Sequence, residues 1–567
     1  MCKSGGNSLS SSIKKQLQEV DQLIVHGKLP EAYEMINKGL KDKKISKEEE
    51  LQFLTYKSEL EYYFGNYDES IRLAELVLKE NKGEDNLLLS VDACTWKATS
   101  SFFNGETSDC LEAFEKGSTI LSDIKNLPEK TIAKHKAQLM SWQAFLIIHL
   151  GNFERGLELA LEASSYAEKS EYKNIICLNS MITVECYIKF HEWERAKIYY
   201  DKALSLATEI ENKFLLAFCY VMSGRRYNIR EAEKIEELYK KGFSLAEEIG
   251  AKLLLAIKHD FGNFYRNRFQ FDKAIECYQE SLKYAPIMKW LAYGNLASTY
   301  FMKYDLEKAR EYSLKGKKYC EEINDRYSLP SYLESLIAIA IELNNLEEAK
   351  KYLKELKELS EETGFEKINQ IYKYSSISIM KASGKMSDLV KAAELLNEFL
   401  EKERLLVAHR LEVLYSLLEI RLKELQLSPD EETLKEVQKR LYHLEIEAED
   451  KKAQWFLANV YRLQSQLALV ELDIKKANEL LEKAQKIADE MNIELLKNEI
   501  KKDREKLEQQ LTKFKKFQEQ KVPISETVKL VSLENTARNI KRETVIEERD
   551  QETGEIIEYR KLFALRM

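Results

Sequence analysis

The stretch FGNFYRNRFQFDKAIECYQESLKYAP, residues 261–286, describes two short helices joined by a tight corner. Apolar and small residues recur in it at helical spacing, which places them on one face of each helix. These residues are Phe261, Gly262 and Tyr265 in the first helix and Phe271, Ala274, Ile275, Tyr278 and Ser281 in the second. Pro286 ends the unit. Two helices of this length bury little apolar surface alone, so the stretch predicts packing against neighbouring hairpins.

The same corner recurs along the chain with a period of about forty residues. A corner residue, often Gly, is followed two positions later by a large apolar residue and three positions beyond that by a small one. The clear copies are 26–40, 64–78, 104–118, 150–164, 190–204, 303–317, 343–357 and 471–485, and residues 227–246 fit a further unit. The corner residues are Gly27, Gly65, Gly105, Gly151, His191, Phe269, Tyr304 and Asn344. A fixed period of this kind indicates a repeat protein.

The alternation of small and large residues has a physical reason. Small residues such as Ala32 and Ala274 let two helix backbones approach closely, and large ones such as Phe153 and Tyr278 fill the space between hairpins. The corner between the helices often requires a positive φ, which Gly and Asn tolerate. The sequence therefore predicts an all-α chain of stacked helix pairs.

In its large and small residues (Gly262, Tyr265, Ala274, Tyr278 and Pro286 in one unit) the chain resembles the tetratricopeptide repeat. Units near forty residues are similar to its longer variants, those of the MalT-like regulators and the Rap-type peptide sensors. The resemblance covers roughly residues 13–500. It implies a right-handed superhelical solenoid of antiparallel helix pairs, with a concave groove lined by the first helix of each pair.

The expected organisation has five parts. Residues 1–12 are expected to be a disordered N-terminus, 13–384 regular repeats, 385–500 degenerate repeats with longer helices, and 501–521 a capping helix. In residues 522–567 we expect a short helix and then a small β-hairpin tail, because β-rich runs flank DQETGE and Gly554 can take its corner.

Composition limits the class of protein. The 567 residues carry a formal net charge of −8 with both signs interspersed, so we expect no direct binding of nucleic acid. The 8 cysteines form no Cys-x-x-Cys and fall mostly on apolar helix faces, which favours a reducing compartment. The first residues have no apolar run typical of a signal peptide, and no stretch is long enough to cross a bilayer, so we expect a cytoplasmic protein without membrane contact.

No motif for catalysis or cofactor binding is present. The sequence contains no phosphate-binding loop, dinucleotide fingerprint, Gly-x-Ser-x-Gly or kinase signature. HEWER at 191–195 lacks the second His of a zinc-protease helix, and no His/Cys group has ligand spacing. We therefore expect no enzyme activity, no catalytic residues, no cofactor and no metal.

A polar stripe on the first helices is the candidate partner-binding groove. Its residues are Arg225, Arg226, His259, Asn263, Arg266, Asn267, Asn295 and Ser298. Asn and His can bond the backbone of an extended peptide, and Arg can hold a carboxylate. By resemblance, His259, Asn263 and Asn295 occupy positions of the carboxylate clamp of chaperone-binding repeats, but Ser331 and Ser335 stand where that clamp needs basic residues. The alternative is an ordinary solvated helix face.

Two further alternatives remain open. Trp96, Trp142 and Phe145 either anchor an apolar partner helix in the groove or belong to the core. The chain as a whole is either a non-catalytic scaffold that binds a peptide or partner protein, or a sensor-regulator or enzyme accessory subunit that changes superhelical shape when a ligand binds.

Overall fold

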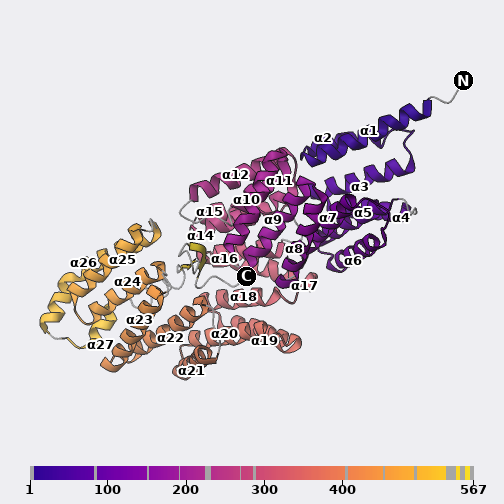
Figure 1. Cartoon of the computed structure of the whole chain (residues 1–567). Coiled ribbons are helices and arrows are strands. Elements are labelled where there is room, and N and C mark those ends of the chain that lie inside the picture. Colours follow the sequence, from indigo (N-terminus) through magenta and orange to yellow (C-terminus); the bar gives the residue numbers. More distant parts are fainter. Residues whose placement is uncertain are drawn as a thin grey trace. The chain divides into compact units, whose positions relative to one another are not determined.

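A computed structural model describes residues 5–81, 86–149, 152–190, 192–223, 232–268, 270–284, 289–402, 407–450, 454–490, 494–520, 522–531, 545–549 and 556–561. Almost all of them lie in α-helices (Figure 1). The chain forms two compact units, residues 1–266 with 272–292 and residues 267–271 with 293–567. This division does not coincide with the boundary expected at residue 384, where the repeat pattern weakens but helix pairs continue.

Most consecutive helices in both units pack against each other. In the first half they are α1 (Gly5–Val25), α2 (Leu29–Gly39), α3 (Lys47–Tyr63), α4 (Tyr67–Glu80), α5 (Leu87–Asn104), α6 (Thr107–Asp123), α7 (Glu129–His149), α8 (Phe153–Ser170), α9 (Lys173–Lys189), α10 (Trp193–Glu209), α11 (Lys213–Ser223), α12 (Ala232–Glu248), α13 (Lys252–Leu255), α14 (Lys258–Asn267) and α15 (Phe271–Ser281). The pairing expected from residues 261–286 is thus present as α14 and α15.

The remaining helices continue the same pattern with longer members. They are α16 (Lys289–Met302), α17 (Leu306–Glu322), α18 (Leu329–Glu342), α19 (Leu346–Thr363), α20 (Glu366–Ala382), α21 (Met386–Lys402), α22 (Val407–Leu427), α23 (Glu431–Asp450), α24 (Gln454–Val470), α25 (Ile474–Glu490), α26 (Glu494–Gln520) and α27 (Ile524–Thr527), followed by the 3-10 helix η4 (Val528–Leu530). Two strands, β1 (Val545–Arg549) and β2 (Ile556–Lys561), pair antiparallel. Gly554, the expected corner, lies outside the described residues.

Two of the expected boundaries are corrected by the helices. The N-terminal residues 1–12 were expected to be disordered, but α1 already begins at Gly5. An established helix extends through a polar run because propagation costs far less than nucleation. The capping helix expected at 501–521 begins earlier, because α26 is continuous from Glu494. Its Leu507 and Phe514 are buried in the core of the second unit.

The corners between paired helices have the conformation that the sequence predicts. The backbone has positive φ at five of the eight corner residues, Gly27, Gly65, Gly105, Tyr304 and Asn344. The other three, Gly151, His191 and Phe269, lie outside the described residues. At the first corner, Gly27 N donates to Ile24 O and Lys28 N to Leu23 O, the paired bonds that close a helix end with a left-handed residue.

Small residues let the helices of a pair approach closely. A Cβ atom added to Gly262 on α14 would lie 2.5 Å from the ring of Tyr278 on α15. In the second unit, a Cβ on Gly316 of α17 would lie 2.0 Å from the ring of Tyr332 on α18. Ala274 on α15 has no exposed surface. These contacts confirm that large rings are seated on residues without side-chain bulk.

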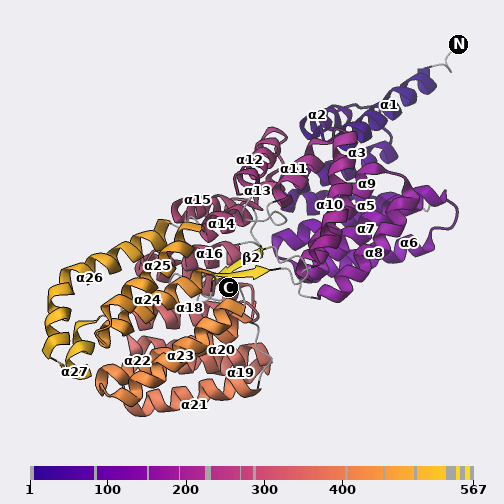
Figure 2. The same cartoon turned by 60° about the vertical axis from the view of Figure 1, so that its left-hand side comes forward.

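In the first unit, the first helices of successive pairs form a continuous inner layer. Each of α1, α3, α5, α7 and α9 contacts the next first helix as well as its own partner, and Figures 1 and 2 show α5, α7 and α9 side by side. Every residue of α9 from Ile175 to Tyr187 is buried. A helix buried on all sides has neighbours on all sides, so this layer is covered by protein on both faces over much of its length.

The inner layer curves until its beginning meets its sixth pair. The side chain of Asn212, between α10 and α11, donates a hydrogen bond to the carbonyl of Val25 at the end of α1, 2.7 Å away. The rings of Tyr63 on α3 and Phe214 on α11 lie 4.4 Å apart. A straight stack would keep these helices far apart, so the first unit forms a closed turn of helix pairs.

Candidate functional site

His259 and Asn263 of the expected polar stripe on α14 contact other residues of the protein. His259 is buried, with 6% of its surface exposed; its Nδ1 donates to Ala256 O at 3.1 Å and its Nε2 lies 3.3 Å from Asp260 Oδ1. Asn263 is half-buried and accepts a hydrogen bond from the Tyr278 hydroxyl at 2.8 Å. Arg266 is half-buried on the same helix.

The other residues of that stripe are either buried or outside the described part. Asn295 and Ser298, which belong to the second unit, are buried. Arg225, Arg226 and the side chain of Asn267 lie outside the described residues. The expectation of an exposed stripe is therefore corrected at His259, Asn295 and Ser298, because neighbouring helices cover the faces that an open groove would leave free.

The tryptophan stripe belongs to the core, the second of its two interpretations. Trp96 and Trp142 are buried, and both rings lie within 6 Å of the Tyr62 ring on α3 (5.7 and 5.5 Å). Phe145, which is partly exposed, stacks on Phe103 of α5. These aromatic contacts join α3, α5 and α7 and fill the inside of the closed turn.

A set of charged side chains lies near these aromatic residues on α3, α5 and α7. We call Asp21, Glu59, Asp92, Lys134 and His135 the inner cluster; they come from α1, α3, α5 and α7. Lys134 Nζ lies 3.7 Å from Asp21 Oδ1, and His135 Nδ1 lies 2.6 Å from Asp92 Oδ1. The Tyr63 hydroxyl donates to Glu59 Oε1 at 3.1 Å. Residues of four different helix pairs thus converge on one site.

Aromatic rings surround the inner cluster. The Tyr56 hydroxyl donates to Asp21 Oδ1 at 3.4 Å. Lys134 Nζ lies 5.0 Å from the centre of the Tyr172 ring, a cation–π distance, and Tyr172 precedes α9. The cluster is only partly covered, since the side chains of Asp21, Lys134, Asp92 and His135 are 31%, 21%, 21% and 13% exposed. The polar atoms of the cluster are therefore partly desolvated but not sealed from solvent.

The electrostatics of the inner cluster favour added positive charge. Burial, and next the nearby Asp92 carboxylate, raise the pKa of Glu59 to about 8, although the Tyr63 hydroxyl and Lys134 act in the opposite direction. Burial disfavours the charged form of Lys134, but Asp21 and Asp92 outweigh it and raise the pKa of this amine. A cation bound beside Glu59 would favour the ionised form of this carboxylate over the protonated form.

Within the described residues, no group of three or more His, Cys, Asp and Glu side chains is arranged to hold a metal ion. None of the helices in the described ranges combines the length and apolar character of a membrane span. The arrangement of the inner cluster suits recognition of a charged group by ion pairs and hydrogen bonds.

The sequence contained one signal for the inner cluster. In α5, Asp92 and Lys97 are the only charged residues between Leu87 and Asn104. A carboxylate within an otherwise uncharged, buried helix is costly unless it has a role or a partner. Asp21 and Lys134 gave no such signal, because both stand among other charged residues on helices that appear to be ordinary amphipathic ones in the sequence.

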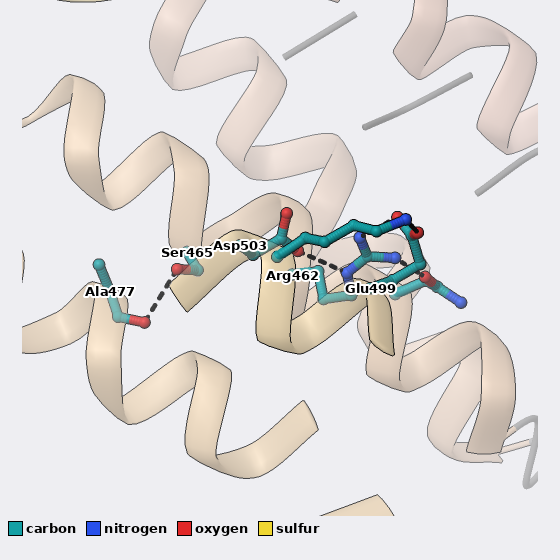
Figure 3. Close-up of polar contacts among 7 residues, drawn as sticks. Arg462, Ser465, Ala477, Glu499 and Asp503 are labelled. Atoms are coloured by element: carbon teal, nitrogen blue, oxygen red, sulfur yellow. Dashed lines mark hydrogen bonds and ion pairs between the residues drawn. The ribbon is translucent and has the colours of Figure 1, made fainter. Parts of the chain in front are cut away.

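A second charged group, in the second unit, is buried, and Figure 3 shows its Arg462 beside Glu499 and Asp503. Arg462 on α24 has 1% of its side chain exposed; its Nε donates to Asp503 Oδ2 at 2.7 Å and its Nη2 to Glu499 Oε2 at 3.3 Å. Burial raises the pKa of Asp503 despite Arg462. Both carboxylates are on α26, so these ion pairs fasten the long C-terminal helix to α24 and leave no accessible group for a ligand.

No family model matches the chain, and no curated protein sequence matches it significantly. Among solved structures, a signal transduction ATPase with a tetratricopeptide repeat sensor from Pyrococcus horikoshii is similar at 18% identity and a TM-score of 0.39, over 62% of this chain and 53% of that one. A Rap protein complexed with competence and sporulation factor is similar at 16% identity and a TM-score of 0.43, over 64% of this chain and 99% of that one. The apo quorum sensor NprR from B. thuringiensis is similar at 17% identity and a TM-score of 0.34, over 59% of this chain and 100% of that one.

These scores are too low to carry an argument about function, and the first alignment spans about half the length of that protein. The fold rests on the helix pairs, their left-handed corners and the rings seated on glycine. In these features the chain resembles the tetratricopeptide-repeat proteins.

Proposed function

We propose that the chain is a non-catalytic binding protein whose first unit holds a segment of a partner protein or a peptide, and that the inner cluster recognises a cationic group on that segment. The observation that carries the proposal is the convergence of Asp21, Glu59 and Asp92 from three helix pairs around a single lysine. Lys, Arg or a terminal amine would supply the cationic group.

The raised pKa of Glu59 in the partly exposed inner cluster supports a role in recognition over one in folding alone. In an ion pair that serves only stability, the cation favours the charged form of the carboxylate. At Glu59 the opposite holds, because burial and Asp92 raise its pKa to about 8. A bound cation would favour the ionised carboxylate. Binding should then release a proton from Glu59 near neutral pH, and affinity should rise as the pH approaches 8.

Selection from a random peptide library tests the proposal. The full-length protein and a Glu59→Gln/Asp92→Asn variant are each used to select displayed peptides, with Glu129→Gln as the matched control. Glu129 is on α7 like Lys134, and its side chain is 84% exposed. We expect the wild type and the control to enrich peptides with a shared Lys or Arg, and the double variant to lose them.

Two results would count against the proposal. Enrichment of the same basic peptides by the double variant would place their binding elsewhere, and enrichment of acidic peptides would reverse the charge preference. Binding of a selected peptide should also weaken as salt rises from low to physiological concentration, because charge attraction across a partly exposed site is screened.

A further inference from the structure

Two turns far apart in the sequence meet where the first unit closes. The turn after α1 contains His26 and Gly27, and the turn before α11 contains Ile210 and Asn212. His26 Nδ1 donates to the Ile210 carbonyl at 2.8 Å, across 184 residues. Asn212 Nδ2 donates to the Val25 carbonyl at 2.7 Å, across 187 residues. We call these four residues and Val25 the clasp.

The backbone approach at the clasp requires glycine. Gly27 has φ +65°, and an added Cβ would lie 2.6 Å from Asn212 Oδ1, 2.8 Å from Phe214 N and 2.9 Å from Lys213 N. Two of these neighbours are backbone atoms, which cannot turn away as a flexible side chain can. A side chain at residue 27 would therefore hold the two turns apart.

Asn212 has two separable tasks. Its Oδ1 accepts a hydrogen bond from Leu215 N at 2.8 Å, which caps the first turn of α11. Its Nδ2 satisfies the carbonyl of Val25, one of the last in α1, which has no partner in its own helix. The capping bond is local to α11, whereas the bond to Val25 exists only while the turn of helix pairs is closed.

The clasp is also connected to the inner cluster through α1. Asp21, which contacts Tyr56 of α3 and Lys134 of α7, lies on the last turns of α1, next to Val25 and His26. Movement of this end of α1 would carry Asp21 away from Lys134. The two hydrogen bonds of the clasp act beside the ring contact of Tyr63 with Phe214, and each of them can be exchanged for a bond to water.

We infer that the clasp is a releasable closure of the first unit, and that its opening admits a partner segment to the inner cluster. The second half of this inference rests on the proposed function, whereas the first half concerns the unliganded protein alone. Release would move the C-terminal end of α1 and the turn before α11, and would leave helix pairs remote from both turns unchanged.

Asn212→Asp separates the clasp from the cap. The aspartate retains an oxygen for Leu215 N, but it has no donor for the Val25 carbonyl and places negative charge beside it. Asn152→Asp is the matched control, because Asn152 caps α8 through Arg155 N at a distance from the clasp. Hydrogen exchange is followed by mass spectrometry on the full-length protein without ligand.

In Asn212→Asp we expect exchange in residues 20–30 to speed up by about tenfold, the factor that a loss of 1.4 kcal/mol gives, while exchange in α18 and α19 stays unchanged. The control should match wild type throughout. Unchanged exchange in residues 20–30 would overturn the clasp, and so would faster exchange spread over the whole chain, because that reports general unfolding.

The second half is tested with a library-selected basic peptide and the association rate constant. A clasp that gates the inner cluster makes association faster in Asn212→Asp, and an unchanged or slower rate would overturn the gating. If the library yields no basic peptide, the proposed function and the gating fail together. The exchange result still decides the closure, so the failures are distinguishable.

Discussion

Gly262→Ala tests the contact on which the helix pair of residues 258–281 depends. The added Cβ would lie 2.5, 2.7 and 2.9 Å from three ring atoms of Tyr278, whose side chain has no exposed surface. Carbon atoms in favourable contact are about 3.5–4.0 Å apart, so the ring must move by roughly 1 Å. Because the ring is fully buried, its movement displaces neighbouring atoms of the core.

The expected loss follows from three contributions. Overpacking of a tight core costs about 1–3 kcal/mol. Displacement of the ring also weakens the hydrogen bond from the Tyr278 hydroxyl to Asn263, which contributes about 0.5–1.5 kcal/mol. In the opposite direction, Ala is a better helix former than Gly by about 1 kcal/mol. The net expectation is a destabilisation of about 1–3 kcal/mol.

Urea unfolding followed by circular dichroism, with hydrogen exchange of residues 258–284 as a local readout, measures this loss. Tyr278→Phe keeps the ring and removes only the hydroxyl, so it reports the hydrogen bond alone and should cost less than Gly262→Ala. A Gly262→Ala variant as stable as wild type, or more stable, would refute the close contact, because helix propensity would then exceed the steric term.

Three further predictions concern other parts of the chain. Ala274→Leu, at a position without exposed surface, should lower the free energy of unfolding by about 1–3 kcal/mol, and an unchanged urea midpoint would show that α15 has another register. Glu59→Gln should become more stable relative to wild type as the pH is raised from 5 to 9. The folded state holds the Glu59 proton more tightly than the unfolded state, so wild-type stability falls as the pH rises from about 4.5 towards about 8, and glutamine removes this loss. Equal pH dependence of both proteins in urea titrations would contradict this. Arg462→Ala should cost about 3–5 kcal/mol by leaving Asp503 buried without its ion-pair partner, while Glu499 keeps Lys502; a cost below about 1 kcal/mol would show that water reaches Asp503.

Local features of the fold could be predicted from the sequence. The corners at Gly27, Gly65, Gly105, Tyr304 and Asn344 depend on a few neighbouring residues, and each has the expected positive φ. The packing of large rings on small residues involves only one helix pair or two neighbouring pairs. A forty-residue sequence period is therefore enough to predict it.

The candidate site could not be predicted in the same way. Which face of a first helix remains open depends on curvature accumulated over six helix pairs, and no single unit encodes it. His259 has the expected position on α14 but is covered by protein. Asp21 and Lys134, which lie 113 residues apart in the sequence, approach to 3.7 Å through the stacking of several helix pairs. Asn212, which bonds the Val25 carbonyl across the closure, is in the sequence an ordinary cap residue.

The α26 attachment was missed for a related reason. A capping helix at 501–521 with apolar Leu507 and Phe514 was predicted, but not the continuous helix from Glu494. Arg462, however, is separated from Glu499 and Asp503 by 37 and 41 residues. Charged residues at such separations are ordinary surface residues in most helical proteins, so burial was needed to single them out.

The central claim is that the inner cluster binds a cationic group, and a double-mutant cycle between Asp92 and the shared basic residue of a selected peptide tests it most directly. Isothermal titration calorimetry gives the affinity for wild type and Asp92→Asn, each with the peptide and with its Lys→Met or Arg→Met counterpart. We predict a coupling free energy above about 1 kcal/mol, since groups in direct contact are not additive. Coupling within about 0.5 kcal/mol of zero, with all four affinities measurable, would contradict the claim, because independent sites add.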